Sequence, residues 1–211
     1  MKKLAIIGSG DLGQLAAHHA KVCGYEVVGY FDDTKSKGTL IKGCPVLGKT
    51  FEIENSFADK TFDFLFSAIG YKHFKFRKEI FEKYFGKIPF AKLIHPSCYI
   101  DPSCNTGEGI FLLPGCVLDK DVKLGNNILL NTGVIIAHDT QIGSHSFIAP
   151  AVHLAGFIKT GECCMLGIGT TVIDNITLGN NIQTGAGAVV TEDISEPGLY
   201  VGVPARKIKQ K

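Results

Sequence analysis

The sequence lacks the features that mark membrane, secreted and nucleic-acid-binding proteins. No apolar run is long enough to cross a bilayer, and Met1 leads directly into a short strand-like segment rather than a signal-peptide pattern. The formal charge is only +2, and acidic and basic residues are interspersed rather than blocked. These absences predict a cytoplasmic protein that neither inserts into membranes nor binds nucleic acid.

Paired cysteine motifs are absent too. The chain has seven cysteines, none of which forms a CxxC pair. Four of them occupy the sixth position of a six-residue repeat, which favours small buried side chains over disulfides or a metal site. These four are Cys98, Cys104, Cys116 and Cys164.

The repeat runs through the second half of the chain. From Leu93 to Ile194 the sequence divides into seventeen hexads without an insertion, and branched aliphatic residues fill fourteen of the seventeen second positions. Gly, Asn, Asp and Pro are frequent at the third to fifth positions. A period of six fits neither a helix nor strands joined by hairpins. It predicts short strands separated by turns, with one aliphatic side chain per hexad on a common axis. Burial of each such side chain contributes about 1.5–3 kcal/mol.

The first 90 residues have a different pattern. Residues 3–7 and 26–31 read as buried strands, and 62–68 read as a third strand, which is followed closely by Gly70. Helices are expected over 12–22 and 73–84, which makes a small parallel α/β unit. Gly8, Gly10 and Gly13 form a GxGxxG loop after the first strand, and the acidic pair Asp32 and Asp33 follows the second.

This glycine loop alone is typical of NAD-dependent oxidoreductases. A complete dinucleotide fold needs two mononucleotide halves, however, and the segment before the repeat has room for one. The loop N–H groups and a helix N-terminus still suit phosphate oxygens, and a carboxylate after the second strand suits a ribose or a base edge. We therefore interpret the unit as a holder for a nucleotide or a nucleotide sugar, with an oxidoreductase as the alternative.

The hexads resemble the hexapeptide-repeat family, whose fold is a left-handed parallel β-helix with three hexads in each triangular coil. The glycine loop, the repeat and the terminal VGVPA (201–205) together resemble bacterial nucleotide-sugar N-acetyltransferases of the bacillosamine type, and also the related sialic acid O-acetyltransferases. The resemblance implies a Rossmann-like half-domain over residues 1–90 and a β-helix acyltransferase domain with a C-terminal tail over residues 91–211. It also implies a homotrimer with acetyl-CoA as co-substrate.

The segment 129–143 is similar to the active-site stretch of this family. The match implies that His138 is the general base and that Asp139 increases its basicity. Such a base is needed because an amine that attacks a thioester must lose a proton, and imidazole titrates near neutral pH. Asn131 matches a polar contact near the sugar.

The resemblance also implies two binding sets. The nucleotide sugar would be held by Gly8, Ser9, Gly10, Asp32, Asp33 and Gly70. Acetyl-CoA would lie along Phe147, Gly156, Ile168, Gly185 and Ala186. Two departures weaken individual contacts: Phe147 and Leu12 stand near positions where the family commonly has histidine.

Three alternatives remain open at this point. The same base could acetylate a sugar hydroxyl, as in an O-acetyltransferase that acts on sialic acid or a polysaccharide precursor. The chain could be a non-catalytic nucleotide-sugar-binding scaffold. A histidine-bound metal is the third, but His138, His145 and His153 lack ligand spacing, so we expect no metal. His145 and His153 are expected to be solvated.

Overall fold

The computed structural model describes residues 1–208, which form two compact units, Met1–Leu93 and the segment from Ile94 onward. The last three residues of the expected second domain, 209–211, lie outside the described residues. Among the described residues, no helix is long and apolar enough to cross a membrane. Each unit has its own hydrophobic core.

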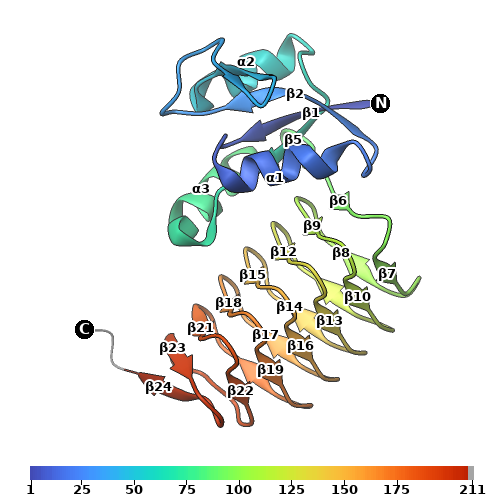
Figure 1. The fold of residues 1–211 in the computed structure, drawn as a ribbon, viewed down its shortest axis with the longest axis vertical. Coiled ribbons are helices and arrows are strands. Elements are labelled where there is room, and N and C mark those ends of the chain that lie inside the picture. The colour runs from blue at the N-terminus through green and yellow to red at the C-terminus, as the bar shows by residue number, and fades with distance from the viewer. Residues whose placement is uncertain (209–211) are drawn as a thin grey trace. The chain divides into compact units, whose positions relative to one another are not determined.

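The first unit is a five-stranded sheet with helices on both faces (Figure 1). The strand order is β3-β4-β2-β1-β5, and every pair is parallel except the β3–β4 hairpin. The predicted strands and helices are confirmed to within two residues, whereas β3, β4 and α2 were not predicted. The elements are β1 (Lys2–Ile7), α1 (Asp11–Ala20), β2 (Tyr25–Phe31), β3 (Leu40–Ile41), β4 (Cys44–Gly48), the 3-10 turn Thr50–Glu52, α2 (Ile53–Ala58), β5 (Phe64–Ser67), the 3-10 turn Tyr71–His73 and α3 (Phe74–Tyr84).

Alternation along the strands sorts side chains between the two faces of this sheet. Ile7 and Phe31 pack with Ile53 of α2 and Phe81 of α3 in one cluster. Tyr30, the neighbour of Phe31, points to the opposite face, where α1 lies. The carboxyl ends of β1, β2 and β5 therefore meet at one edge between two helical layers, which is where parallel α/β sheets bind ligands.

The second unit is a left-handed parallel β-helix with three faces (Figure 1). Face 1 contains β6 (Leu93–Ile94), β9 (Phe111–Leu112), β12 (Leu129–Leu130), β15 (Phe147–Ile148), β18 (Met165–Leu166), β21 (Ile182–Thr184), β23 (Gly198–Val201) and β24 (Arg206–Ile208). Face 2 contains β7 (Tyr99–Ile100), β10 (Val117–Leu118), β13 (Ile135–Ile136), β16 (His153–Leu154), β19 (Thr171–Val172) and β22 (Val189–Val190). Face 3 contains β8 (Asn105–Thr106), β11 (Lys123–Leu124), β14 (Gln141–Ile142), β17 (Lys159–Thr160) and β20 (Thr177–Leu178).

One coil takes eighteen residues, because Val117 pairs with Ile135 and Leu118 with Ile136. Second-position aliphatics such as Leu130 and Ile136 fill the interior, where both are fully buried. Cys116 and Cys164 are also fully buried in this core, while Cys98 and Cys104 are partly buried against it. The predicted aliphatic column and the buried cysteine slot are therefore confirmed.

Three corners join the faces: the first corner leads from face 1 to face 2, the second from face 2 to face 3, and the third from face 3 back to face 1. The fifth residue of fourteen consecutive hexads, from 109 to 187, has positive φ. Glycine, asparagine and aspartate fill most of these positions, because they tolerate the left-handed conformation best.

The expectation for His145 is wrong. This histidine is 4% exposed, and its Nδ1 lies 3.0 Å from Nδ2 of Asn127, one coil away. The hexad pattern gives its corner position, but not the amide partner that makes burial of the ring tolerable. His153 is exposed on face 2, as predicted.

Candidate functional site

The glycine loop between β1 and α1 borders a cavity of about 410 Å³ at the carboxyl edge of the sheet. Gly8 takes φ +90°, and a Cβ at Gly13 would lie 2.0 Å from the Gly8 carbonyl oxygen, so both positions require glycine. Gly10 precedes α1, whose first N–H groups have no side-chain cap. The cavity is lined by Ile7, Gly8, Gly10, Phe31, Asp32, Asp33, Thr34, Thr50, Ala68, Ile69, Gly70, His73 and Phe76.

Asp32 connects the glycine loop to the end of β2. Its Oδ2 accepts hydrogen bonds from the Ser9 N–H (2.9 Å) and hydroxyl (2.6 Å), and its Oδ1 accepts from the Thr34 N–H (2.8 Å) and hydroxyl (2.7 Å). Burial alone would raise the pKa of Asp32, but these hydrogen bonds outweigh burial and hold the pKa well below its usual range. With four donors on two oxygens, this carboxylate has no acceptor site left for a ligand.

Asp33 is different. Its Oδ1 accepts from the Thr50 N–H at 2.8 Å and its Oδ2 from the Thr50 hydroxyl at 2.9 Å, so each oxygen keeps one acceptor site. Both aspartates line the cavity, as the sequence predicts, but only Asp33 can accept a further hydrogen bond from a ligand. Ser9 does not line the cavity, because its side chain is buried against Asp32.

Gly10 and Gly70 border the same cavity with open space where a side chain would be. Both have ordinary extended backbone conformations, with φ of −69° and −75°. Their lack of a side chain is therefore not required by the fold, and it leaves room for a ligand. Sequence reasoning missed Thr34, Thr50 and His73, which come to this edge from the loop after β2 and from two 3-10 turns that no motif distinguishes.

His138 stands at the second corner of the β-helix, at the fourth position of its hexad. Its Nδ1 lies 3.0 Å from Oδ2 of Asp139, and its side chain is 46% exposed. An Nδ1–H donated to the carboxylate leaves the Nε2 lone pair free to accept a proton. The structure therefore brings the two predicted catalytic residues into a hydrogen-bonded pair.

Gly156 lies one coil above His138. A Cβ there would be 2.8 Å from Cε1 and 3.0 Å from Nε2 of the imidazole. The missing side chain thus creates the space that the ring occupies. The ring of the next residue, Phe157, meets the imidazole edge-on at a centroid distance of 5.1 Å and an interplanar angle of 87°.

The other predicted residues of the β-helix lie elsewhere. Asn131, Ile168, Gly185 and Ala186 are all at the first corner, on the opposite side of face 2 from His138. Ile168 is 58% exposed, and the Asn131 side chain accepts a hydrogen bond from the Thr132 N–H. Phe147 lies on face 1 and is buried, at 8% exposure. One protomer therefore does not bring its two corners together.

Residues 3–84 match the family model described as the PglD N-terminal domain. The whole chain is similar to PerB, the perosamine N-acetyltransferase of Caulobacter crescentus, solved with CoA and GDP-perosamine. The identity is 30% and the TM-score 0.91, over 99% of this chain and 98% of that one. The acetyltransferase domain of PglB from Neisseria gonorrhoeae is also 30% identical, with a TM-score of 0.89 over 99% and 100% of the two chains. The chain belongs to this family of sugar N-acetyltransferases.

A more distant structure, WeeI from Acinetobacter baumannii, shares the fold with a TM-score of 0.83 at 23% identity, over 99% of this chain and 100% of that one. Membership in the sugar N-acetyltransferase family confirms the predicted family and fold. It selects acetylation of an amine over acetylation of a hydroxyl. It also excludes the two other interpretations, an oxidoreductase and a non-catalytic scaffold.

Proposed function

We propose that this enzyme transfers the acetyl group of acetyl-CoA to the amino group of a nucleotide-linked amino-deoxy sugar, with His138 as general base. The observation that carries the proposal is the His138–Asp139 pair at 3.0 Å on an exposed corner, where Nε2 has no hydrogen-bond partner among residues 1–208. The relatives add support: PerB was solved with CoA and GDP-perosamine, and the PglB domain with acetyl-CoA. Variants of one histidine of the Caulobacter enzyme were also solved with CoA and GDP-perosamine.

The proposed chemistry needs one proton acceptor near the thioester. The amine lone pair attacks the acetyl carbonyl carbon, a C–N bond forms, and Nε2 of His138 takes the amine proton. The C–S bond then breaks, and the departing thiolate receives the proton from the imidazolium. Asp139 stabilises the imidazolium and keeps the proton of the neutral ring on Nδ1. Thioesters are already activated, so no metal is required.

The cavity at the carboxyl edge of the sheet is the proposed nucleotide-sugar site. The loop N–H groups and the start of α1 suit the diphosphate. The two acceptor sites left on Asp33 suit hydroxyl or N–H groups of the ribose or base. In this proposal Asp32 and Ser9 shape the loop rather than touch the ligand. Because nucleotide sugars and acetyl-CoA are made in the cytoplasm, we propose that the enzyme works there.

We further propose a homotrimer with a composite site. Apart from Phe147 on face 1, the predicted residues of the β-helix occupy two corners of one protomer. Face 2, which lies between these corners, exposes apolar residues, with Tyr99 at 57% and Ile135 at 41%. If face 2 packs against a neighbouring copy, the second corner of one protomer meets the first corner of the next. His138 and Gly156 would then share a groove with Asn131 and Ile168 of the neighbour.

Two experiments test these proposals. His138→Ala should lower the rate at least about 10²-fold, typical of a lost general base, in a screen of UDP-, dTDP- and GDP-linked 4-amino sugars that follows thiol release. Wild-type turnover by that variant would reject the assignment.

The composite site is tested by co-assembling His138→Ala with Ile168→Glu at equal amounts. About a quarter of the sites should then be intact, because random pairing supplies one good corner from each side. A mixture no more active than the two variants measured separately contradicts the composite site, and a monomer in sedimentation contradicts the trimer.

A further inference from the structure

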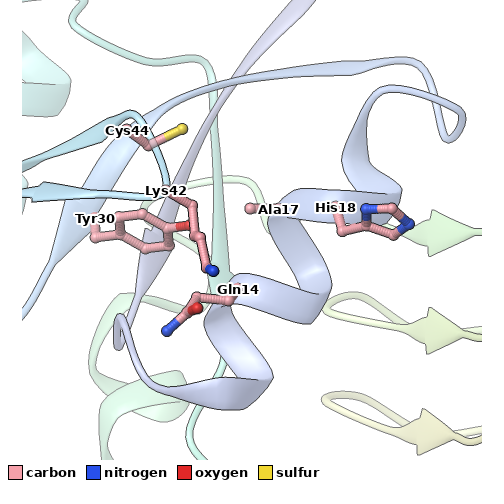
Figure 2. A pocket seen from close by; sticks show the side chains of 6 residues that line it. All are labelled: Gln14, Ala17, His18, Tyr30, Lys42 and Cys44. Atoms are coloured by element: carbon pink, nitrogen blue, oxygen red, sulfur yellow. The ribbon is translucent and has the colours of Figure 1, made fainter.

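A second cavity, of about 360 Å³, lies in the first unit on the α1 side of the sheet (Figure 2). It shares no lining residue with the proposed nucleotide-sugar site. Its walls come from one side of α1, from β2, and from the β3–β4 hairpin. The lining residues are Gln14, Ala17, His18, Tyr30, Lys42 and Cys44.

Tyr30 brings an unpaired hydroxyl to this cavity. The residue is fully buried, and its hydroxyl has no hydrogen-bond partner among the described residues. Burial raises the pKa of Tyr30, so the group remains a protonated donor at neutral pH. A buried hydroxyl without a partner is unfavourable, and natural proteins rarely keep one unless a ligand or a water molecule pairs with it.

Lys42 adds a cation. It occupies the turn between β3 and β4 with φ +50°, and no carboxylate of residues 1–208 forms an ion pair with it. The cavity lining contains no acidic side chain. The lining is therefore rich in hydrogen-bond donors and has at least one positive charge.

We propose that this cavity binds a small oxyanion, a phosphate or carboxylate group, through the Tyr30 hydroxyl and the Lys42 ammonium. Lysine binds phosphate as a point charge, and the volume suits a small ligand. Gln14 connects the cavity with the glycine loop, because its Nε2 donates a hydrogen bond to the Ser9 carbonyl oxygen at 3.1 Å. A ligand that contacts Gln14 would therefore be linked to the glycine loop through this one side chain.

The test measures binding of inorganic phosphate and, separately, of acetate by titration at constant ionic strength. Tyr30→Phe and Lys42→Asn should each weaken binding at least about tenfold, as expected for the loss of a hydrogen bond or charge that contacts an anion. Lys35→Asn, which removes an exposed charge from the loop between β2 and β3, should bind like the wild type. Gly10→Val, which obstructs the other cavity, should do so too. Equal binding by Tyr30→Phe, Lys42→Asn and Lys35→Asn, or loss of binding in Gly10→Val, overturns the proposal. The stronger of the two anions identifies the group.

A second inference comes from the corner residue Phe157. Fourteen fifth-position residues have positive φ, and Phe157 at +60° is the one phenylalanine among them. The residue is 51% exposed. A bulky side chain is disfavoured in the left-handed region, and within one protomer an exposed phenyl gains little from burial. Local structure therefore does not account for this residue.

Its neighbour does. The Phe157 ring lies edge-on to the His138 imidazole at 5.1 Å, Asp139 holds Nδ1 at 3.0 Å, and Gly156 leaves the space above the ring. We infer that Phe157 is a positioning residue that fixes the imidazole plane and so directs Nε2 at the acceptor amine. This inference rests on the proposed role of His138. A residue that breaks the local rule at a reacting group is typical of functional sites.

The test sets activity against stability. Phe157→Asn should raise the midpoint of thermal unfolding, because asparagine suits positive φ, and should lower kcat about tenfold with little change in KM, because misplaced groups react slowly. Phe157→Tyr, which keeps the ring, should restore kcat. Cys163→Asn also places asparagine at a fifth position with positive φ, but at the third corner, and it should leave kcat unchanged. Wild-type kcat in Phe157→Asn while His138→Ala is inactive defeats this inference alone. An active His138→Ala defeats the proposed function as well.

Discussion

Gly156→Ala is the substitution whose effect follows most directly from the geometry. The new Cβ would lie 2.8 Å from Cε1 of His138, whereas carbon atoms rest at about 3.5–4.0 Å, so the ring must move by roughly 0.7 Å. Gly156 has no positive φ, so alanine fits its backbone, and the imidazole is the group that yields. A displacement of 1 Å at a catalytic group costs about 10²-fold. We expect kcat/KM to fall between about 10-fold and 100-fold.

The assay is steady-state release of CoA thiol with an amino-sugar substrate, corrected for the cysteines of the enzyme. Circular dichroism and the thermal midpoint should match those of the wild type, because the exposed ring moves and the coil does not. The control is the double variant His138→Ala/Gly156→Ala, which should be no slower than His138→Ala alone. Activity of Gly156→Ala within threefold of the wild type would refute the reasoning, and so would an equal loss in both backgrounds.

Four further variants test the fold and the first cavity. Gly10→Ala should fold normally but raise the KM for the nucleotide sugar, which steady-state kinetics would measure. Gly13→Ala should fail to fold stably, because its Cβ would lie 2.0 Å from the Gly8 carbonyl oxygen, and the yield of soluble protein would show this. Asp32→Asn should lower the free energy of unfolding at pH 7 by about 1–3 kcal/mol, measured by denaturant titration. The difference from the wild type should shrink below about pH 4. A carboxylate whose pKa is lowered by folding contributes stability above its unfolded pKa, and this contribution is lost as the pH falls through the folded pKa. Leu130→Ala, in the aliphatic column, should cost about 2–5 kcal/mol in the same titrations, and a loss below 1 kcal/mol would contradict its place in the core.

The β-helix could be predicted because its information is local and periodic. Each hexad repeats an aliphatic residue and a turn, so the interior column and the corners follow from counting along the chain. The position of His138 at a corner follows in the same way. The burial of His145 does not, because it depends on Asn127 one coil away, and the period alone does not tell which corner side chains pair.

The first unit shows where such counting ends. The GxGxxG loop and the two acids after β2 correctly indicate the edge where the cavity lies. The division of roles between Asp32 and Asp33 depends on Thr34 and Thr50, which donate to them. Thr50 is seventeen residues beyond Asp33 and belongs to no motif. Only the folded arrangement distinguishes the saturated carboxylate from the one that can still accept a hydrogen bond.

The eighteen-residue coil has a consequence for how such an enzyme can change length. Each added coil lengthens the prism by one strand spacing, about 4.8 Å, each deleted coil shortens it by the same amount, and all other residues stay on their original faces. Whole-coil insertions beyond Phe157 would lengthen the scaffold in fixed increments while preserving the alignment of its edges and the contacts of the imidazole with the next coil. The distance between the imidazole and the C-terminal end of the prism is thus a discrete quantity that duplication of whole coils can change.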